Sequence, residues 1–217
     1  MRAMLTAADG HRFDAHFALP KGKPRGGLVV VQEAFGVNAY VKEVCERFAA
    51  EGYACLAPAL YDRQERGAVF DSHDGENLVK ARKLRAGLVW ADVLKDMAAS
   101  VEHLREFGRV GVVGYCVGGS VAWLAALDID IDAAVSYYGR EVAEWLDRKP
   151  RCPVLLHFGD RDHLIPVKDV EKIKTVYADS VYLYPAGHGF DRDDSEAARL
   201  ARQRTLEHFE RHLARGA

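Results

Sequence analysis

The sequence predicts an α/β fold in which a mostly parallel sheet carries helices on both faces and an N-terminal hairpin precedes it. Two observations predict this fold. Short apolar runs that suit buried parallel strands alternate along the chain with segments of helical pattern. The chain has 217 residues and 49% hydrophobic content, which suffices for one well-buried core. We therefore expect a single domain over residues 1–217.

The strands are predicted from apolar and β-branched runs. Residues 4–19 form an expected hairpin that turns at Asp9-Gly10, with Phe13, Ala15 and Phe17 on one face. The buried runs that follow are bounded by glycine, proline or polar residues. They predict strands at residues 28–31, 53–57, 109–113, 133–138, 153–158 and 181–184.

The helices are predicted from amphipathic segments between those strands. Gly52, for example, ends the first of them. The expected helices cover residues 38–51, 76–84, 90–107, 120–127, 141–146, 167–177 and 195–213. Strand and helix thus alternate, which is typical of a parallel sheet covered on both faces.

Charge and cysteine usage exclude several classes of protein. Lys and Arg number 30 against 32 Asp and Glu, and the basic residues are spread along the chain, so nucleic acid is not an expected partner. The uncharged run 110–127 holds four glycines within ten residues, which favours a buried βα unit over a membrane segment. The four cysteines show no C-x-x-C spacing, and the N-terminus lacks a signal peptide's apolar core. We expect a cytoplasmic monomer with reduced thiols.

The segment 114–119, Gly-Tyr-Cys-Val-Gly-Gly, is the most informative motif. Its spacing is that of a nucleophile elbow, G-x-nucleophile-x-G, in which a strained turn between a strand and a helix exposes the central side chain. Glycines flank that residue because larger side chains would collide with the crossing backbone. Cys116 stands where such elbows usually carry serine.

Other reactive side chains follow the predicted strands, where ligands bind in a parallel sheet. They are Glu33, the pair Asp160 and Asp162, and His188. Nucleophile, acid and histidine then occur in the chain order of α/β-hydrolases. The sequence therefore predicts an α/β-hydrolase fold with a thiol nucleophile.

The chemistry assigns a role to each group. His188 would take the thiol proton, while a carboxylate on its other nitrogen fixes the tautomer. His163 is a rival base, but it adjoins Asp162, whose side chain would point away from it along an extended chain. Spacing leaves Asp160 and Asp162 both open as the acid, and it leaves Glu33 either at the surface or in the site.

Backbone N–H groups complete the expected machinery. Those of Ala34 and Val117 would form the oxyanion hole, and the helix behind the elbow would favour the thiolate. No metal and no cofactor is expected, because the sequence has no paired short metal-ligand spacing, no P-loop and no G-x-G-x-x-G fingerprint.

Almost the whole chain resembles the dienelactone hydrolases (carboxymethylenebutenolidases), which are α/β-hydrolases with a cysteine nucleophile. The resemblance is carried by residues 32–38 (QEAFGVN), 57–64 (APALYDRQ), 113–119 (VGYCVGG), 137–139 (YYG), 162–166 (DHLIP) and 186–190 (AGHGF). It implies the triad Cys116, Asp162 and His188, and so selects Asp162 over Asp160. It also implies opening of a small carboxylate-bearing lactone through a thioester.

The resemblance implies two further residues and shows one departure. Glu33 and Arg192 match a glutamate that contacts the resting thiol and an arginine that pairs with it and binds the substrate carboxylate. In the family a second arginine binds that carboxylate and a tyrosine follows four residues on, but Leu78 and Arg82 stand at those positions. We expect Arg82, or alternatively Lys80, to supply a cation from a shifted position.

The departure leaves the exact substrate open. A broader carboxylesterase or thioesterase on the same fold is the alternative activity. A ligand-binding homologue without catalysis is the remaining one, since the fold does not dictate the function.

Overall fold

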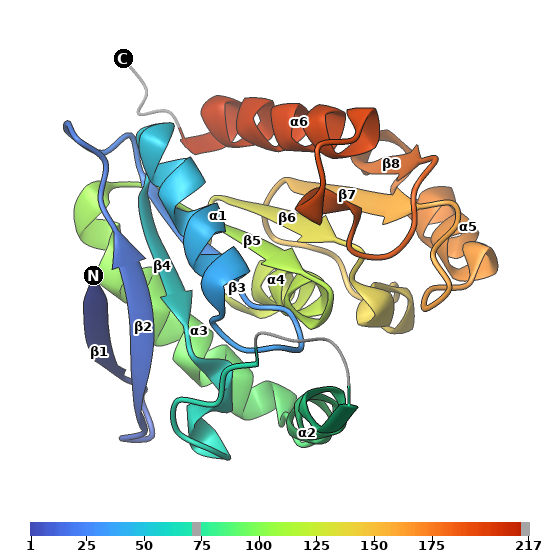
Figure 1. Ribbon diagram of the computed structural model, residues 1–217. Helices are drawn as coiled ribbons and strands as arrows, with labels where there is room; N and C mark the ends of the chain where they lie inside the picture. Colours follow the sequence, from blue (N-terminus) through green and yellow to red (C-terminus); the bar gives the residue numbers. More distant parts are fainter. Residues whose placement is uncertain (71–74, 214–217) are drawn as a thin grey trace.

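The sheet of the computed structural model, which describes residues 1–70 and 75–213, has eight strands (Figure 1). Their order is β1-β2-β4-β3-β5-β6-β7-β8. The strands are β1 (Arg2–Thr6), β2 (Arg12–Ala18), β3 (Gly27–Val31), β4 (Ala54–Pro58), β5 (Val110–Tyr115), β6 (Ala133–Tyr137), β7 (Val154–Gly159) and β8 (Val181–Tyr184). Only the pairs β1–β2 and β2–β4 are antiparallel within this sheet of the described residues. The predicted parallel sheet and N-terminal hairpin are confirmed.

Helices cover both faces of the sheet (Figure 1). On one face lie α1 (Ala39–Ala50) and α6 (Glu196–Leu213), where Phe48 and Phe209 meet edge to face. On the other face lie α3 (Trp90–Leu104) and α4 (Val117–Asp128), whose small and apolar side chains share a core with β3 and β5. Two further helices, α2 (Gly75–Ala86) and α5 (Val167–Val176), flank the carboxyl end and the far edge of the sheet.

The structure differs from the sequence prediction at two helices near the elbow. The predicted helix at 141–146 is a short 3₁₀ turn, η3 (Arg140–Glu144). The helix after the elbow begins at Val117, three residues earlier than predicted. Its first turn contains two glycines because a Cβ on Gly118 would lie 2.5 Å from the carbonyl oxygen of Val31, and one on Gly119 would strike the backbone of Tyr137. Close packing of helix on strand therefore overrides the low helix propensity of glycine.

The carboxyl ends of the parallel strands meet at one edge of the sheet, and the loops that leave them carry the predicted site residues. Glu33 follows β3, Cys116 follows β5, Asp162 follows β7, and His188 follows β8. Across residues 1–70 and 75–213, no helix combines the length and apolarity needed to cross a membrane.

Candidate active site

Cys116 occupies a strained turn between β5 and α4. Its backbone has φ 56° and ψ −119°, a region that residues other than glycine rarely adopt. The turn is held by the Cys116 N–H, which donates to the carbonyl of Tyr137 at 3.0 Å. A Cβ on Gly114 would collide with the backbone of Gly118. The two glycines thus let the chain cross itself, and the thiol is left half-buried at the sheet edge.

His188 and Asp162 form the hydrogen bond expected of a base and its orienting acid. Nδ1 of His188 lies 2.7 Å from Oδ2 of Asp162. The other carboxylate oxygen accepts from the backbone N–H groups of Leu164 at 2.8 Å and Ile165 at 3.1 Å. Asp160 points elsewhere, since its side chain is 42% exposed and lies 3.7 Å from Arg161. Geometry thus separates the two acids that spacing left open.

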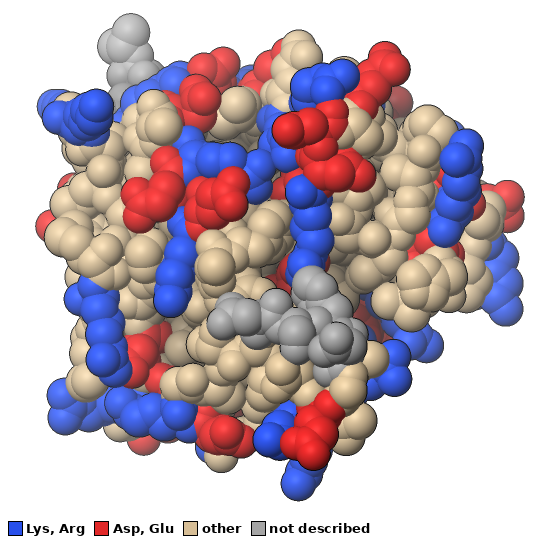
Figure 2. Space-filling view, in the orientation of Figure 1, with Lys and Arg blue, Asp and Glu red and all other residues tan. Residues whose placement is uncertain are grey.

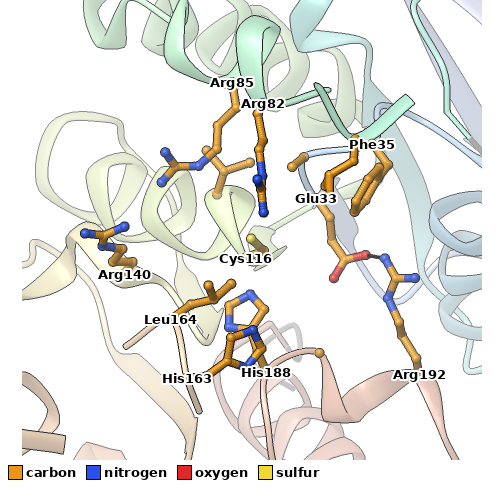
Figure 3. Close-up of a pocket in the computed structure, with 14 residues that line it drawn as sticks. Glu33, Phe35, Arg82, Arg85, Cys116, Arg140, His163, Leu164, His188 and Arg192 are labelled. Carbon is orange, nitrogen blue, oxygen red and sulfur yellow. Dashed lines mark hydrogen bonds and ion pairs between the residues drawn. The ribbon is translucent and has the colours of Figure 1, made fainter. Parts of the chain in front are cut away.

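The electrostatics of His188 favour the protonated ring. Burial by itself lowers the pKa of His188, but the hydrogen bonds and charges of Asp162 and Cys116 outweigh it and raise the pKa to about 10. Nε2 is buried and has no hydrogen bond of ordinary geometry within the described residues. The imidazole lies beside the Cys116 sulfur (Figure 3). The ring can therefore hold a proton next to sulfur and pass it to a bound molecule.

Glu33 and Arg192 form an ion pair on the other side of the thiol (Figure 3). The Glu33 side chain is 5% exposed and that of Arg192 is 28% exposed. Burial opposes the charge on the guanidinium, yet the pair with Glu33 outweighs it and raises the pKa of Arg192. The guanidinium also lies 4.9 Å from the ring centroid of Tyr40 and 5.9 Å from that of Phe35.

A buried polar cluster backs this ion pair, and the sequence reasoning did not find it. The Tyr40 hydroxyl donates to Oδ2 of Asp191 at 2.6 Å. Asp191 is fully buried, with Arg47 at 3.6 Å and Arg202 at 3.9 Å from its oxygens. Burial raises its pKa to about 6, although Tyr40 and the two arginines work against this shift. The available signal was Asp191 itself, a carboxylate between the apolar Phe190 and Arg192.

Side-chain hydrogen bonds from Tyr61 and Gln32 fix the loop after β3. Tyr61 donates its hydroxyl to the carbonyl of Ala34 at 2.9 Å. The Gln32 side chain accepts from the N–H of Leu60 at 3.2 Å and donates to the carbonyl of Glu33 at 3.3 Å. These bonds fix the main chain at Ala34, which lines the same cavity as Val117. The two residues expected to form an oxyanion hole are thus brought to one site.

A cavity of about 670 Å³ joins these groups. Of the predicted residues, Asp162 supports His188 from behind, and all the others line the cavity: Glu33, Ala34, Leu78, Arg82, Cys116, Val117, His188 and Arg192. The lining residues that the sequence reasoning did not place there as site residues are Phe35, Arg85, Arg140, His163, Leu164 and Gly189. Lys80 is not among the lining residues and lies 3.8 Å from Glu76. Of the two expected candidates on α2, Arg82 and Lys80, only Arg82 lines the cavity among the described residues.

Comparison with known proteins gives a consistent result. Residues 13–213 match the model of the dienelactone hydrolase family. The carboxymethylenebutenolidase of Pseudomonas putida is 35% identical over 94% of this chain and 93% of its own length. The enzyme of that name from Pseudomonas sp. strain P51 is 34% identical over 95% of this chain and 93% of its own length.

Solved structures share the same architecture. A crystal structure from Klebsiella pneumoniae subsp. pneumoniae, provisionally described as a dienelactone hydrolase, superimposes with a TM-score of 0.81 at 30% identity over 98% of this chain and 99% of that one. An esterase of Pyrococcus furiosus has a TM-score of 0.73 at 16% identity over 99% of this chain and 91% of that one, which shows the shared fold alone. On sequence and structure together, the chain belongs to the dienelactone hydrolase family and is a hydrolase with the α/β-hydrolase fold.

Proposed function

We propose that this hydrolase opens a small carboxylate-bearing lactone through the triad Cys116, His188 and Asp162. The observation that carries the proposal is the placement of His188, which bonds Asp162 on one ring nitrogen and lies beside the Cys116 sulfur with the other. Relatives named carboxymethylenebutenolidase, at up to 35% identity over most of the chain, support a lactone of the dienelactone type.

The reaction begins with the Cys116 thiolate beside the protonated His188 ring, and the sulfur attacks the lactone carbonyl carbon. The carbonyl electron pair moves onto oxygen, where the N–H groups of Ala34 and Val117 stabilise it. When the carbon–oxygen ring bond breaks, His188 returns its proton to the leaving oxygen. A thioester with an open chain remains on Cys116.

Water completes the cycle. His188 accepts a proton from water, whose oxygen attacks the thioester carbonyl, and the sulfur leaves as thiolate. Asp162 keeps Nδ1 protonated throughout because its second oxygen is fixed by the N–H groups of Leu164 and Ile165. The product is the hydroxy acid, and the enzyme is regenerated.

The pair Glu33 and Arg192 couples substrate binding to this chemistry. A substrate carboxylate would compete with Glu33 for the Arg192 guanidinium, whose planar fork suits carboxylates. Glu33, which is buried, is then displaced from its partner and is free to take the thiol proton. A carboxylate on the substrate thereby helps to generate the thiolate.

The test is a steady-state assay with dienelactones, neutral aryl esters and acyl thioesters. The lactone carrying a carboxylate should give the highest kcat/KM. Cys116→Ala should abolish hydrolysis, and Cys116→Ser should retain only a small part of it, because a hydroxyl depends more heavily on the His188 base. Cys152→Ala is the matched control, since this half-buried cysteine does not line the cavity.

Four results would contradict the proposal. Hydrolysis within tenfold of wild type in Cys116→Ala would remove the thiol from the mechanism. Equal kcat/KM for neutral and anionic substrates would favour a broad carboxylesterase, and the strongest turnover of thioesters would favour a thioesterase. Stoichiometric binding without turnover would instead indicate a ligand-binding homologue.

A further inference from the structure

The cavity is rich in arginine, in contrast to the rest of the molecule. The whole chain has a formal charge of −2, and on the face seen in Figure 2 basic and acidic side chains are interspersed. Among the described residues, however, the cavity lining has four arginines, Arg82, Arg85, Arg140 and Arg192, and one carboxylate, that of Glu33. A concave site lined by one sign of charge concentrates ligands of the opposite sign.

Two of these arginines already have carboxylate partners. Arg192 pairs with Glu33, and Arg85 pairs with Glu141. Glu141 is itself fixed, because its other oxygen accepts from the Ser120 hydroxyl at 2.6 Å, and that hydroxyl accepts from the Glu141 N–H at 3.1 Å. This second pair therefore has a defined position at the start of η3.

Arg82 and Arg140 are different. Within residues 1–70 and 75–213, neither guanidinium makes a hydrogen bond or an ion pair, yet both line the cavity. Figure 3 shows Arg82 reaching down from α2 toward the Cys116 sulfur. Arg85 and Arg140 lie on the opposite side of that sulfur from Glu33 and Arg192.

We propose that Arg82 and Arg140 form a second anion subsite, with Arg85 beside them, and that the preferred substrate carries an anionic group at each end. The inference rests on the proposed hydrolase function and extends it from a monoanionic to a dianionic lactone or ester. One carboxylate would engage Arg192, the scissile carbonyl would lie at Cys116, and the second carboxylate would engage Arg82 and Arg140.

The geometry and the volume support a second subsite over one shared subsite. A single carboxylate cannot bind Arg140 and Arg192 together, because the thiol lies between them (Figure 3). The cavity, about 670 Å³, is within the range of about 300–1,000 Å³ that accommodates drug-sized ligands. Guanidinium groups bind carboxylates bidentately, so two free ones can hold one anionic group firmly.

The experiment uses four aryl esters in a two-by-two design. The acyl chain ends in either a carboxylate or its methyl ester, and the aryl leaving group either carries a carboxylate or does not. Both monoanions are included, so the design does not depend on which end faces Arg192. The measured quantity is kcat/KM for wild type, Arg82→Gln, Arg140→Gln and the double variant.

In the wild type, the dianion should exceed the better monoanion by about tenfold or more, the gain that one charge-assisted contact of about 1.4 kcal/mol provides. The double variant should lose this gain, so that its kcat/KM for the dianion falls to that for the better monoanion. Lys80→Gln removes the same charge from the same helix outside the cavity, since Lys80 lies 3.8 Å from Glu76, and it should keep the full gain.

Three outcomes would overturn the subsite. The first is a wild type whose kcat/KM for the dianion does not exceed that for the better monoanion. The second is an equal loss of kcat/KM for monoanion and dianion in Arg82→Gln. The third is a loss of the dianion's gain in Lys80→Gln as large as in Arg82→Gln. The second would place Arg82 with Arg192 on one carboxylate, and the third would reduce the effect to the overall charge of α2.

A binding measurement separates this inference from the proposed function. Calorimetry with Cys116→Ala compares an unreactive saturated dicarboxylate with its monomethyl ester. Tighter binding of the dicarboxylate that Arg82→Gln/Arg140→Gln removes would support the subsite even if no ester were hydrolysed. Absence of Cys116-dependent hydrolysis would refute the proposed function alone, and equal binding of both ligands would refute the subsite alone.

Discussion

The two sides of the cavity hold their arginines in different ways. On the paired side, Arg192 contacts Glu33 and the Tyr40 ring, and buried Asp191 lies behind them. On the open side, Arg82 and Arg140 are exposed and have no polar partner among the described residues. The paired side therefore contributes to folding, and in the proposed mechanism it also binds the substrate. Arg82 and Arg140 are free of that constraint, so they can change with little effect on stability.

The strongest test of this comparison lies between the two sides, at His188. Arginines keep their charge at all ordinary pH values, so the alkaline pH dependence reports on His188 and leaves the arginines of both sides unchanged. Asp162→Asn should lower kcat/KM by about 10⁴-fold. It should also lower the pKa of His188, which is about 10 in the wild type, by about 1–3 units.

The direction of the His188 pKa shift follows from its pair with Asp162. Asp162 raises the pKa of His188, so the stabilisation from this pair is full below about 6.5, the ordinary histidine value, and is lost as pH rises through about 10. The alkaline limb of the kcat/KM profile should therefore move to lower pH in Asp162→Asn. An unchanged limb would mean that another group controls it.

The next largest effect separates the two sides by stability. Arg192→Gln leaves the buried carboxylate of Glu33 without a partner and should lower the free energy of unfolding by about 3 kcal/mol. Arg82→Gln removes an exposed side chain and should change it by less than about 0.5 kcal/mol. Urea unfolding of both variants provides the measurement. Equal losses would abolish the distinction between the paired and open sides.

A smaller effect is expected behind the paired side. Tyr40→Phe removes the 2.6 Å hydrogen bond to Asp191 and should cost about 2 kcal/mol, as expected for a bond to a charged group. Tyr138→Phe is the matched control, because the Tyr138 hydroxyl is buried without a hydrogen-bond partner in the described residues. Its removal should be neutral or stabilising. A loss in Tyr138→Phe as large as in Tyr40→Phe would mean that hydroxyl burial, and not the Asp191 contact, is being measured.

The smallest expected effect is the salt dependence of kcat/KM, which should differ between the two sides. Exposed charges are screened over a Debye length of about 10 Å at 0.1 M salt, whereas buried pairs are screened much less. Raising the salt concentration should therefore reduce the dianion's gain a few-fold in the wild type and leave the rate with a monoanion that binds Arg192 nearly constant. Equal salt dependence for both substrates would indicate that Arg192 is as exposed as Arg82.

The residues that sequence could predict lie at strand ends, because the fold fixes where those ends meet. Cys116, Asp162 and His188 follow three parallel strands, and the structure gathers their side chains at one edge. Asp160 and Asp162 follow the same strand, so spacing could not separate them. The turn that decides between them is set by N–H groups beyond Asp162, which spacing does not reveal.

The residues that sequence missed depend on contacts between distant segments. Tyr40 and Asp191 are 151 residues apart and meet only because α1 and the turn after β8 pack on one face of the sheet. Arg140 directly precedes the expected helix at 141–146 and lies in a 3₁₀ turn at the cavity. No local pattern records these contacts, since tertiary packing alone creates them.

The self-crossing at Gly114 and Gly118 has a consequence for how this lineage can evolve. The position of the reactive atom is set by backbone that touches backbone, so it depends little on which element stands there. Replacing sulfur with oxygen at position 116 changes one atom and leaves the core intact. Selection can therefore exchange one chemistry for the other by a single substitution, and it then needs only to retune the neighbouring base.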